Sequence, residues 1–106
     1  MKRATAIICA YNEENTITSV IETTYNCPNI GQIIVINDGS TDSTGHIISR
    51  LSESIDLTYI NLLPNRGKGY CMASGLELST GDVIVFLDAD IVNLTHRHID
   101  KLLQNE

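Results

Sequence analysis

The stretch Val83-Ile84-Val85-Phe86-Leu87-Asp88-Ala89-Asp90 decides the fold, because five apolar residues in a row are followed directly by an Asp-Ala-Asp sequence with two carboxylates. A short apolar run without polar alternation is typical of a strand that is buried on both faces of a parallel sheet. We therefore predict a buried strand over 82–87. Asp88 and Asp90 then lie just beyond the carboxyl end of that strand.

Three units of the same kind come earlier in the chain. Apolar, β-branched runs predict strands over 4–10, 32–36 and 57–63. Each strand is followed by apolar residues at spacings of three and four, which is typical of a helix. These spacings predict a first helix from Asn15 to about Cys27 and a second around Ile47–Leu51, which Asp42 or Ser43 can cap. They also predict a last helix over 96–104. A third helix is expected to turn an inner face to the sheet that consists of Cys71, Met72, Gly75, Leu76 and Leu78. Strands that alternate with helices predict an α/β domain with a parallel sheet.

Length and charge narrow the class of protein. The chain has 106 residues, which fits one domain over 1–106 and is too short for two independent cores. Seven basic residues against thirteen acidic ones give a net charge of −6, which disfavours a general nucleic-acid binder. Charged residues at 19% and apolar residues at 42% are typical of a globular protein, and they argue against disorder.

Cysteine usage and hydropathy bear on the compartment. The three cysteines show no CxxC spacing and predict neither a disulfide framework nor a zinc site, so we expect reduced thiols in the cytoplasm. No apolar run has the roughly 20 residues that a membrane span needs. The sequence also shows no cleavable secretory signal, so we expect a chain that is neither secreted nor membrane-spanning.

Polar residues follow each predicted strand. In open α/β sheets, ligands bind beyond the carboxyl ends of the strands. Those ends carry Tyr11-Asn12-Glu13-Glu14, Asn37-Asp38-Gly39-Ser40, Pro64-Asn65-Arg66-Gly67-Lys68-Gly69 and Asp88-Ala89-Asp90. The sequence thus predicts a ligand site along one edge of the sheet.

Asp88 and Asp90 are candidate metal ligands. In an extended backbone, residues two apart point to the same side, so both carboxylates would face one place. Such a pair suits Mg²⁺ or Mn²⁺ held jointly by protein carboxylates and substrate phosphates. The alternative is a solvated turn, or caps for the last helix.

Two further loops carry candidate binding groups. Asp38 can accept a hydrogen bond from a ring N–H or a ribose hydroxyl, while Ser40, Thr41 and Asp42 are better explained by a turn and a helix cap. Arg66-Gly67-Lys68-Gly69 places two basic residues in a glycine-containing loop at a helix start, which favours a phosphate site. Lys68 as a solvated surface charge is the alternative.

The remaining chemistry-bearing residues have structural explanations. One of Glu13 and Glu14 is expected to cap the first helix through its dipole. His96 and His98 diverge on a helix and are expected at the surface. Cys9, Cys71, Tyr59 and Phe86 are expected in the core, and Tyr11 is a candidate to contact a flat ligand.

Taken in order, four blocks resemble the family 2 glycosyltransferases: Ile7-Ile8-Cys9-Ala10-Tyr11-Asn12-Glu13-Glu14, Val35-Ile36-Asn37-Asp38-Gly39-Ser40-Thr41-Asp42, Asn65-Arg66-Gly67-Lys68-Gly69 and Phe86-Leu87-Asp88-Ala89-Asp90. The resemblance implies a GT-A fold, a Rossmann-like three-layer arrangement with a parallel sheet of order 3-2-1-4. It implies a nucleotide-diphosphate sugar as ligand, with a UDP-sugar favoured, and Mg²⁺ or Mn²⁺ on the diphosphate. The implied site residues are Ala10, Asn12 and Glu14 near the nucleoside, Asp38 on the base, Lys68 near ribose or phosphates, and Asp88 and Asp90 near ribose and metal.

The resemblance also implies what this chain lacks. Family members are usually considerably longer, and their second half supplies the acceptor site and, in inverting enzymes, a carboxylate base. The chain therefore resembles a truncated nucleotide-binding half, and we expect little or no sugar transfer by it alone. The acceptor, the catalytic base and the stereochemical outcome stay open.

Two alternatives come from other classes of protein. A phospho-receiver domain has a similar length, a parallel sheet and clustered carboxylates, but its phosphoacceptor Asp should follow the third strand, where this chain has Pro64-Asn65-Arg66. A self-associating module is the other alternative, since an incomplete sheet leaves an open edge and an apolar face that a homo-oligomer would cover.

Overall fold

The structure is a computed structural model that describes residues 3–104. Strands and helices alternate along the chain in this region, as the apolar spacings predict. The elements are β1 (Ala4–Ala10), α1 (Ile17–Tyr25), β2 (Ile30–Asp38), α2 (Thr44–Leu51), β3 (Thr58–Leu62), α3 (Lys68–Leu78), β4 (Val83–Asp88) and α4 (His96–Gln104). Every predicted strand and helix is present, with most ends shifted by one or two residues.

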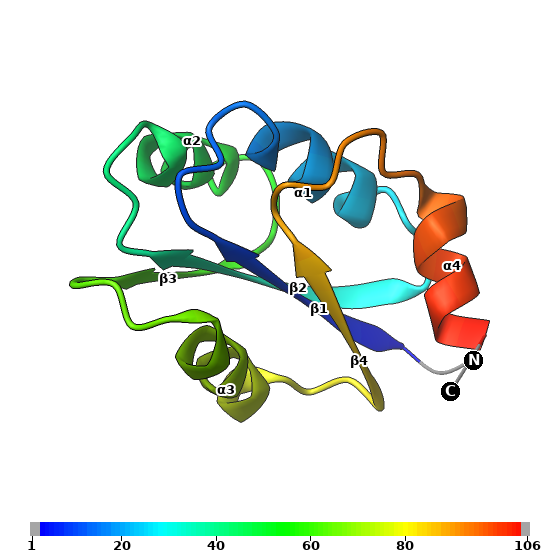
Figure 1. The fold of residues 1–106 in the computed structure, drawn as a ribbon. Helices are drawn as coiled ribbons and strands as arrows, with labels where there is room; N and C mark the ends of the chain where they lie inside the picture. Colours follow the sequence, from blue (N-terminus) through cyan, green and yellow to red (C-terminus); the bar gives the residue numbers. More distant parts are fainter. Residues whose placement is uncertain (1–2, 105–106) are drawn as a thin grey trace.

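The four strands form one parallel sheet of order β3-β2-β1-β4, which confirms the predicted order 3-2-1-4. Helices α1, α2 and α4 lie on one face of the sheet and α3 lies on the other (Figure 1). The predicted three-layer α/β fold is therefore confirmed. The order also contradicts the phospho-receiver alternative, because flavodoxin-like domains of that kind have the order 2-1-3-4-5.

Strand β1, one of the two inner strands, contributes to two separate cores. Its residues Ala6, Ile8 and Ala10 pack into the larger core below α1, α2 and α4. Ile7, on the opposite face, is buried with Ile34, Ile36 and Cys71 in the smaller core between the sheet and α3. Burial on both faces explains why β1 has no polar alternation.

Helix α3 contacts the sheet through a narrow stripe. Of its five predicted inner residues, only Cys71 and Gly75 are buried, while Leu76 and Leu78 are each 47% exposed. Cys71 and Gly75 are one turn apart, and a Cβ on Gly75 would lie 2.6 Å from Cγ2 of Ile7. The small side chains bring the helix close to the sheet, so the neighbouring leucines fall outside the contact.

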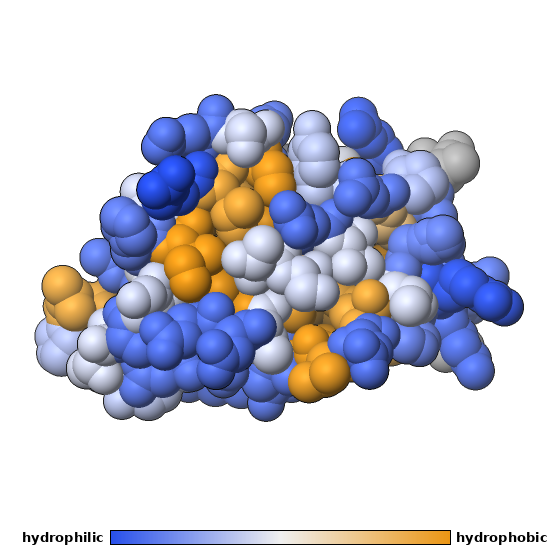
Figure 2. Space-filling model, turned by 90° about the horizontal axis from the view of Figure 1, so that it is seen from above, coloured by the Kyte–Doolittle hydropathy of each residue, from blue (hydrophilic) through white to orange (hydrophobic). Residues whose placement is uncertain are grey.

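Phe86 also differs from its predicted place in the core. It lies on edge strand β4 and is 38% exposed, because α3 packs mainly on β1 and β2. Tyr59 does pack against the larger core, as predicted. On the face seen in Figure 2, apolar surface is divided into separate patches bordered by hydrophilic residues.

The start of α1 corrects the predicted role of the acidic pair. The helix begins at Ile17, and its first turn contains neither Glu13 nor Glu14. The backbone carbonyl of Glu13 accepts hydrogen bonds from Thr16 N and Ile17 N, while the carboxylate of Glu14 accepts one from Ser43 N before α2. Thus Glu14 supports the start of the second helix instead of the first.

None of the helices that the structure describes between residues 3 and 104 combines the length and the hydropathy of a membrane-spanning helix.

Of the two candidate caps of α2, Asp42 makes the hydrogen bonds. Its Oδ1 accepts from Thr44 N at 2.9 Å and from Thr44 Oγ1 at 2.6 Å, whereas Ser43 stands at the N-cap position without a side-chain cap bond. Burial opposes the charged form of Asp42, but the bonds from Thr44 outweigh it and hold the pKa below the ordinary value of 3.8.

We predict that Asp42→Ala lowers the free energy of unfolding by about 1 to 2 kcal/mol, because helix N–H and hydroxyl donors lose their acceptor. Ser43→Ala, the matched control, should change it by much less. Since the folded-state pKa of Asp42 is lowered, its contribution is present at neutral pH and is lost as the pH falls through that value. Urea unfolding of both variants at neutral and acidic pH measures the change in the free energy of unfolding. An equal decrease in the two variants would contradict the prediction.

A second prediction concerns the contact of α3 with the sheet. Gly75→Ala should destabilise the protein by about 1 to 3 kcal/mol, since the new methyl group overlaps Ile7 in a packed core. Gly69→Ala is the control in the same helix, because a Cβ there meets nothing within 4 Å. Thermal unfolding should show a lower midpoint for Gly75→Ala only, and a stabilised Gly75→Ala variant would show that the helix is free to shift.

Candidate functional site

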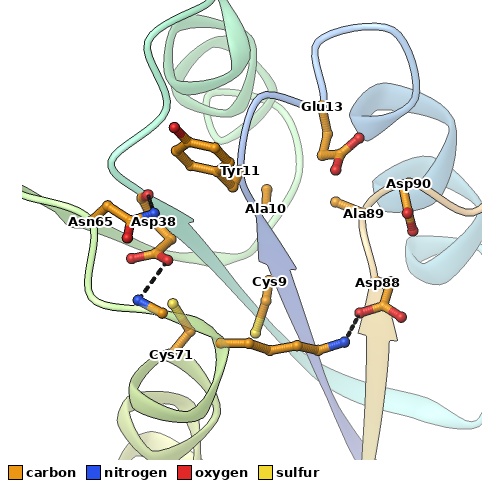
Figure 3. Close-up of a pocket in the computed structure, with 12 residues that line it drawn as sticks. Cys9, Ala10, Tyr11, Glu13, Asp38, Asn65, Cys71, Asp88, Ala89 and Asp90 are labelled. Atoms are coloured by element: carbon orange, nitrogen blue, oxygen red, sulfur yellow. Dashed lines mark hydrogen bonds and ion pairs between the residues drawn. The ribbon is translucent and has the colours of Figure 1, made fainter.

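A pocket of about 380 Å³ opens at the carboxyl ends of the strands. The parallel register places Ala10 of β1 beside Asn37 of β2, and Cys9 beside Asp88 of β4. The polar loops after these strands therefore meet at one edge, as predicted. The lining residues are Cys9, Ala10, Tyr11, Glu13, Asp38, Asn65, Gly67, Lys68, Cys71, Asp88, Ala89 and Asp90 (Figure 3).

The two candidate metal ligands both line this pocket, but their backbone differs from the prediction. Strand β4 ends at Asp88, and Asp90 follows in a turn instead of an extended segment. Ala89 between them is buried, and both carboxylates are exposed toward the pocket (Figure 3). Asp88 and Asp90 therefore line the same pocket, although the turn ends the strand geometry in which alternate side chains point to the same side.

Lys68, the first residue of α3, reaches across the pocket. Its Nζ donates a hydrogen bond to Oδ1 of Asp88 and forms an ion pair with it. The hydrogen bond and charge of Asp88 raise the pKa of Lys68 above its ordinary value, so the ammonium stays charged at neutral pH. The structure thus joins the predicted phosphate side of the site to the predicted metal side.

The carboxylate of Asp38 holds the loop before α3. Oδ1 accepts from Arg66 N at 2.7 Å and Oδ2 accepts from Gly67 N at 2.9 Å, while Asp38 itself is buried. Gly67 has a φ of 91°, a conformation that favours glycine. A carboxylate oxygen can accept more than one hydrogen bond, so Asp38, which lines the pocket, remains a candidate acceptor for a ligand.

Gly39 lets the two loops approach each other closely. It has a φ of 70°, and a Cβ at this position would lie 2.7 Å from the backbone N of Asn65. A side chain here would push the Asn65 loop away from Asp38. The glycine therefore serves the closure of the pocket as well as the turn.

Asn12 and Glu14 are not among the pocket-lining residues. The side chain of Asn12 accepts from Thr41 N at 2.7 Å and from Asp42 N at 3.3 Å, and its backbone N donates to Ser40 Oγ. Together with the bond from Ser43 N to Glu14, these contacts join the first loop to the second. The prediction that both lie near a nucleoside stays untested, and their contacts here shape the loop after β2.

Tyr11 and Glu13 line the pocket from the loop after β1. Tyr11 is 47% exposed, and its predicted contact with a flat ligand stays a prediction. Burial, followed by the charges of Asp90, Asp42 and Asp88, raises the pKa of Glu13. The sequence places Glu13 in a loop at a strand end and favours a helix cap for one of Glu13 and Glu14; in the structure Glu13 lines the pocket, and the first turn of α1 contains neither residue.

Cys9 and Cys71 form part of the pocket floor without the properties of nucleophiles. Burial is the main cause that raises the pKa of both thiols, to about 12 for Cys71. Thiols with raised pKa values stay protonated at neutral pH, and a protonated thiol is a poor nucleophile. Packing, as predicted, accounts for Cys71, which is buried, and for Cys9, which packs against the same core.

The donor set fits a hard divalent cation that shares its ligands with a substrate. Across residues 3–104, no group of three or more His, Cys, Asp or Glu side chains is arranged to hold a metal ion. Asp88 and Asp90 supply carboxylate oxygens, which Mg²⁺ and Mn²⁺ prefer, and these ions often keep waters and phosphate oxygens as their other ligands. His96 and His98 are exposed on α4, outside this pocket, as predicted.

The comparison with known proteins agrees with this geometry. Residues 5–105 match the sequence profile of glycosyl transferase family 2. A poly-β-1,6-N-acetyl-D-glucosamine synthase from Staphylococcus aureus is 34% identical over 92 residues, which cover 83% of this chain and 22% of the synthase.

Solved structures show the same fold. A mannosyltransferase from Pyrobaculum calidifontis, in complex with GDP-Man and Mn²⁺, has a TM-score of 0.85 at 25% identity, over 97% of this chain and 32% of its own. A glucosyl-3-phosphoglycerate synthase from Mycobacterium tuberculosis, in complex with Mn²⁺, UDP and glucosyl-3-phosphoglycerate, has a TM-score of 0.80 at 27% identity, over 97% of this chain and 39% of its own.

This chain spans less than half of each of these relatives. The profile match, in contrast, covers nearly all of its 106 residues. The strand order, the polar edge of the sheet and the profile lead to one assignment. The chain belongs to glycosyl transferase family 2 and has the GT-A fold of its members.

Proposed function

We propose that this chain is the donor-binding part of a metal-dependent glycosyltransferase, with a UDP-sugar as ligand and Mg²⁺ or Mn²⁺ as cofactor. The observation that carries the proposal is the meeting of Lys68 with Asp88 and Asp90 in one pocket at the carboxyl ends of the strands. A cationic side chain beside two hard oxygen ligands suits a diphosphate and its metal ion. The two solved relatives bound to GDP-Man or UDP, each with Mn²⁺, support the same ligand class.

Each lining residue has a place in this proposal. Asp88 and Asp90 would hold the metal ion, and Lys68 would face the phosphates. Tyr11 offers an exposed ring to the nucleoside base, and the carboxylate of Asp38 offers an acceptor to a ring N–H. Ala10, which is buried and small, leaves room for the nucleoside at the end of β1.

The chemistry expected of such a site is largely electrostatic. Departure of a nucleoside diphosphate leaves negative charge on its phosphates, and a bound divalent ion supplies positive charge there. The ammonium group of Lys68 adds a second positive charge that is already positioned by the protein. Transfer of the sugar to an acceptor, whose nature stays open, is proposed for the whole protein.

The proposal predicts that the chain binds UDP in the presence of Mn²⁺ and that Asp90→Asn weakens this binding by about tenfold or more, because an amide lacks the charge that holds the metal ion. Isothermal titration calorimetry measures both affinities, with GDP as a parallel ligand to test the base.

Asp82→Asn is the matched control. Asp82 is an exposed residue that immediately precedes the amino end of β4, whereas the pocket lies at the carboxyl end. Its replacement therefore changes the net charge by the same amount without changing the pocket. Binding should be unchanged in this variant. The proposal would be contradicted if the folded protein bound neither UDP nor GDP, or if both variants weakened nucleotide binding equally.

A further inference from the structure

Lys68 and Asp88 connect two elements that lie on different sides of the pocket. Lys68 is the first residue of α3, and Asp88 is the last residue of β4. Their side chains meet as an ion pair in the pocket, which Cys9 also lines. In this state, one oxygen of Asp88 is the acceptor of a lysine hydrogen bond.

The pair is placed where it can be broken at small cost. The side chains of Lys68 and Asp88 are 61% and 52% exposed, so water and salt screen their attraction. Ion pairs with such exposure contribute little to stability. A ligand with greater charge than an ammonium group can therefore compete for either partner.

The charges around the pair make Lys68 unusual in this pocket. Among the lining residues that the structure describes, four have carboxylates, namely Glu13, Asp38, Asp88 and Asp90, and Lys68 has the basic side chain. Asp38 is already engaged by the N–H groups of Arg66 and Gly67. The ammonium group of Lys68 is thus the positive charge that balances the acidic side next to Asp88.

We propose that Lys68 is the resident counter-ion of Asp88 in the ligand-free protein, and that a divalent cation displaces it so that its ammonium group becomes available to the diphosphate. This inference rests on the proposed function and deepens it. It makes Lys68 a coupling residue: the metal ion releases the lysine for the nucleotide, and the nucleotide draws the lysine away from a metal ligand. Coupling of this kind is reciprocal between the two ligands.

The proposal gives Lys68 effects of opposite sign on the two ligands. Without nucleotide, Lys68 opposes metal binding, because the cation must first break the ion pair. Without metal, Lys68 favours UDP, because it is the nearby positive charge. A residue that only stabilised the fold would not show this reversal.

The test uses Mn²⁺ alone and the variants Lys68→Met and Arg66→Gln, with free Mn²⁺ followed by electron paramagnetic resonance. Arg66 is the matched control, since it lies two residues away and its guanidinium stands over the ring of Tyr70, 5.2 Å from the centroid. Its loss reports the general effect of removing a nearby positive charge.

Lys68→Met should bind Mn²⁺ about two- to fivefold more tightly than Arg66→Gln, the range expected for an exposed ion pair. Lys68→Arg should restore an affinity close to that of the unsubstituted chain.

The outcomes separate this inference from the proposed function. Equal or weaker Mn²⁺ binding by Lys68→Met, relative to Arg66→Gln, overturns it, as does the absence of Mn²⁺ binding in all variants. Calorimetry with UDP in EDTA is the second readout, and Lys68→Met should bind UDP more weakly there than Arg66→Gln does. UDP binding with Mn²⁺ by the unsubstituted chain supports the proposed function even if Lys68→Met fails to show the Mn²⁺ effect. Because both side chains are exposed, circular dichroism should show all variants folded.

Discussion

Parallel pairing of β1 with β2 on one edge and with β4 on the other is the constraint on which the rest of the structure depends. The register sets Cys9 against both Ile36 and Asp88, so three strands end near one another at the same edge of the sheet. Because β1 is buried on both faces, a slip by one residue would exchange the contents of the two cores. The pairing of the strands therefore brings the loops that follow them to one edge of the sheet, even where two loops do not contact each other.

The sequence predicts the sheet well because the strands are apolar runs with clear ends. Ala4–Ala10 and His96–Gln104 agree with the predicted limits of the first strand and the last helix. The gathering of Ala10, Asp38, Lys68, Asp88 and Asp90 in one pocket is also foreseen, since strand ends in a parallel sheet share an edge. These features depend on local spacing and on a general rule of topology.

The features that the sequence does not predict depend on partners from other elements. Periodicity assigns Leu76 and Leu78 to the inner face of α3, but the close approach at Gly75 decides how wide that face is. Similarly, the hydrogen bonds of Asn12 and Glu14 to residues 41–43 form only once the first two loops are adjacent. The ion pair of Lys68 with Asp88 joins residues 20 positions apart, and no spacing in the chain indicates it.

The hold of Asp38 on Arg66 and Gly67 has a consequence for protein engineering. The same carboxylate ends β2 and fixes the backbone immediately before Lys68. A substitution of Asp38 would release the backbone just before Lys68. Under the proposed function, base selectivity and phosphate affinity would be linked traits, and a library that varies residue 38 needs to vary residues 65–68 with it.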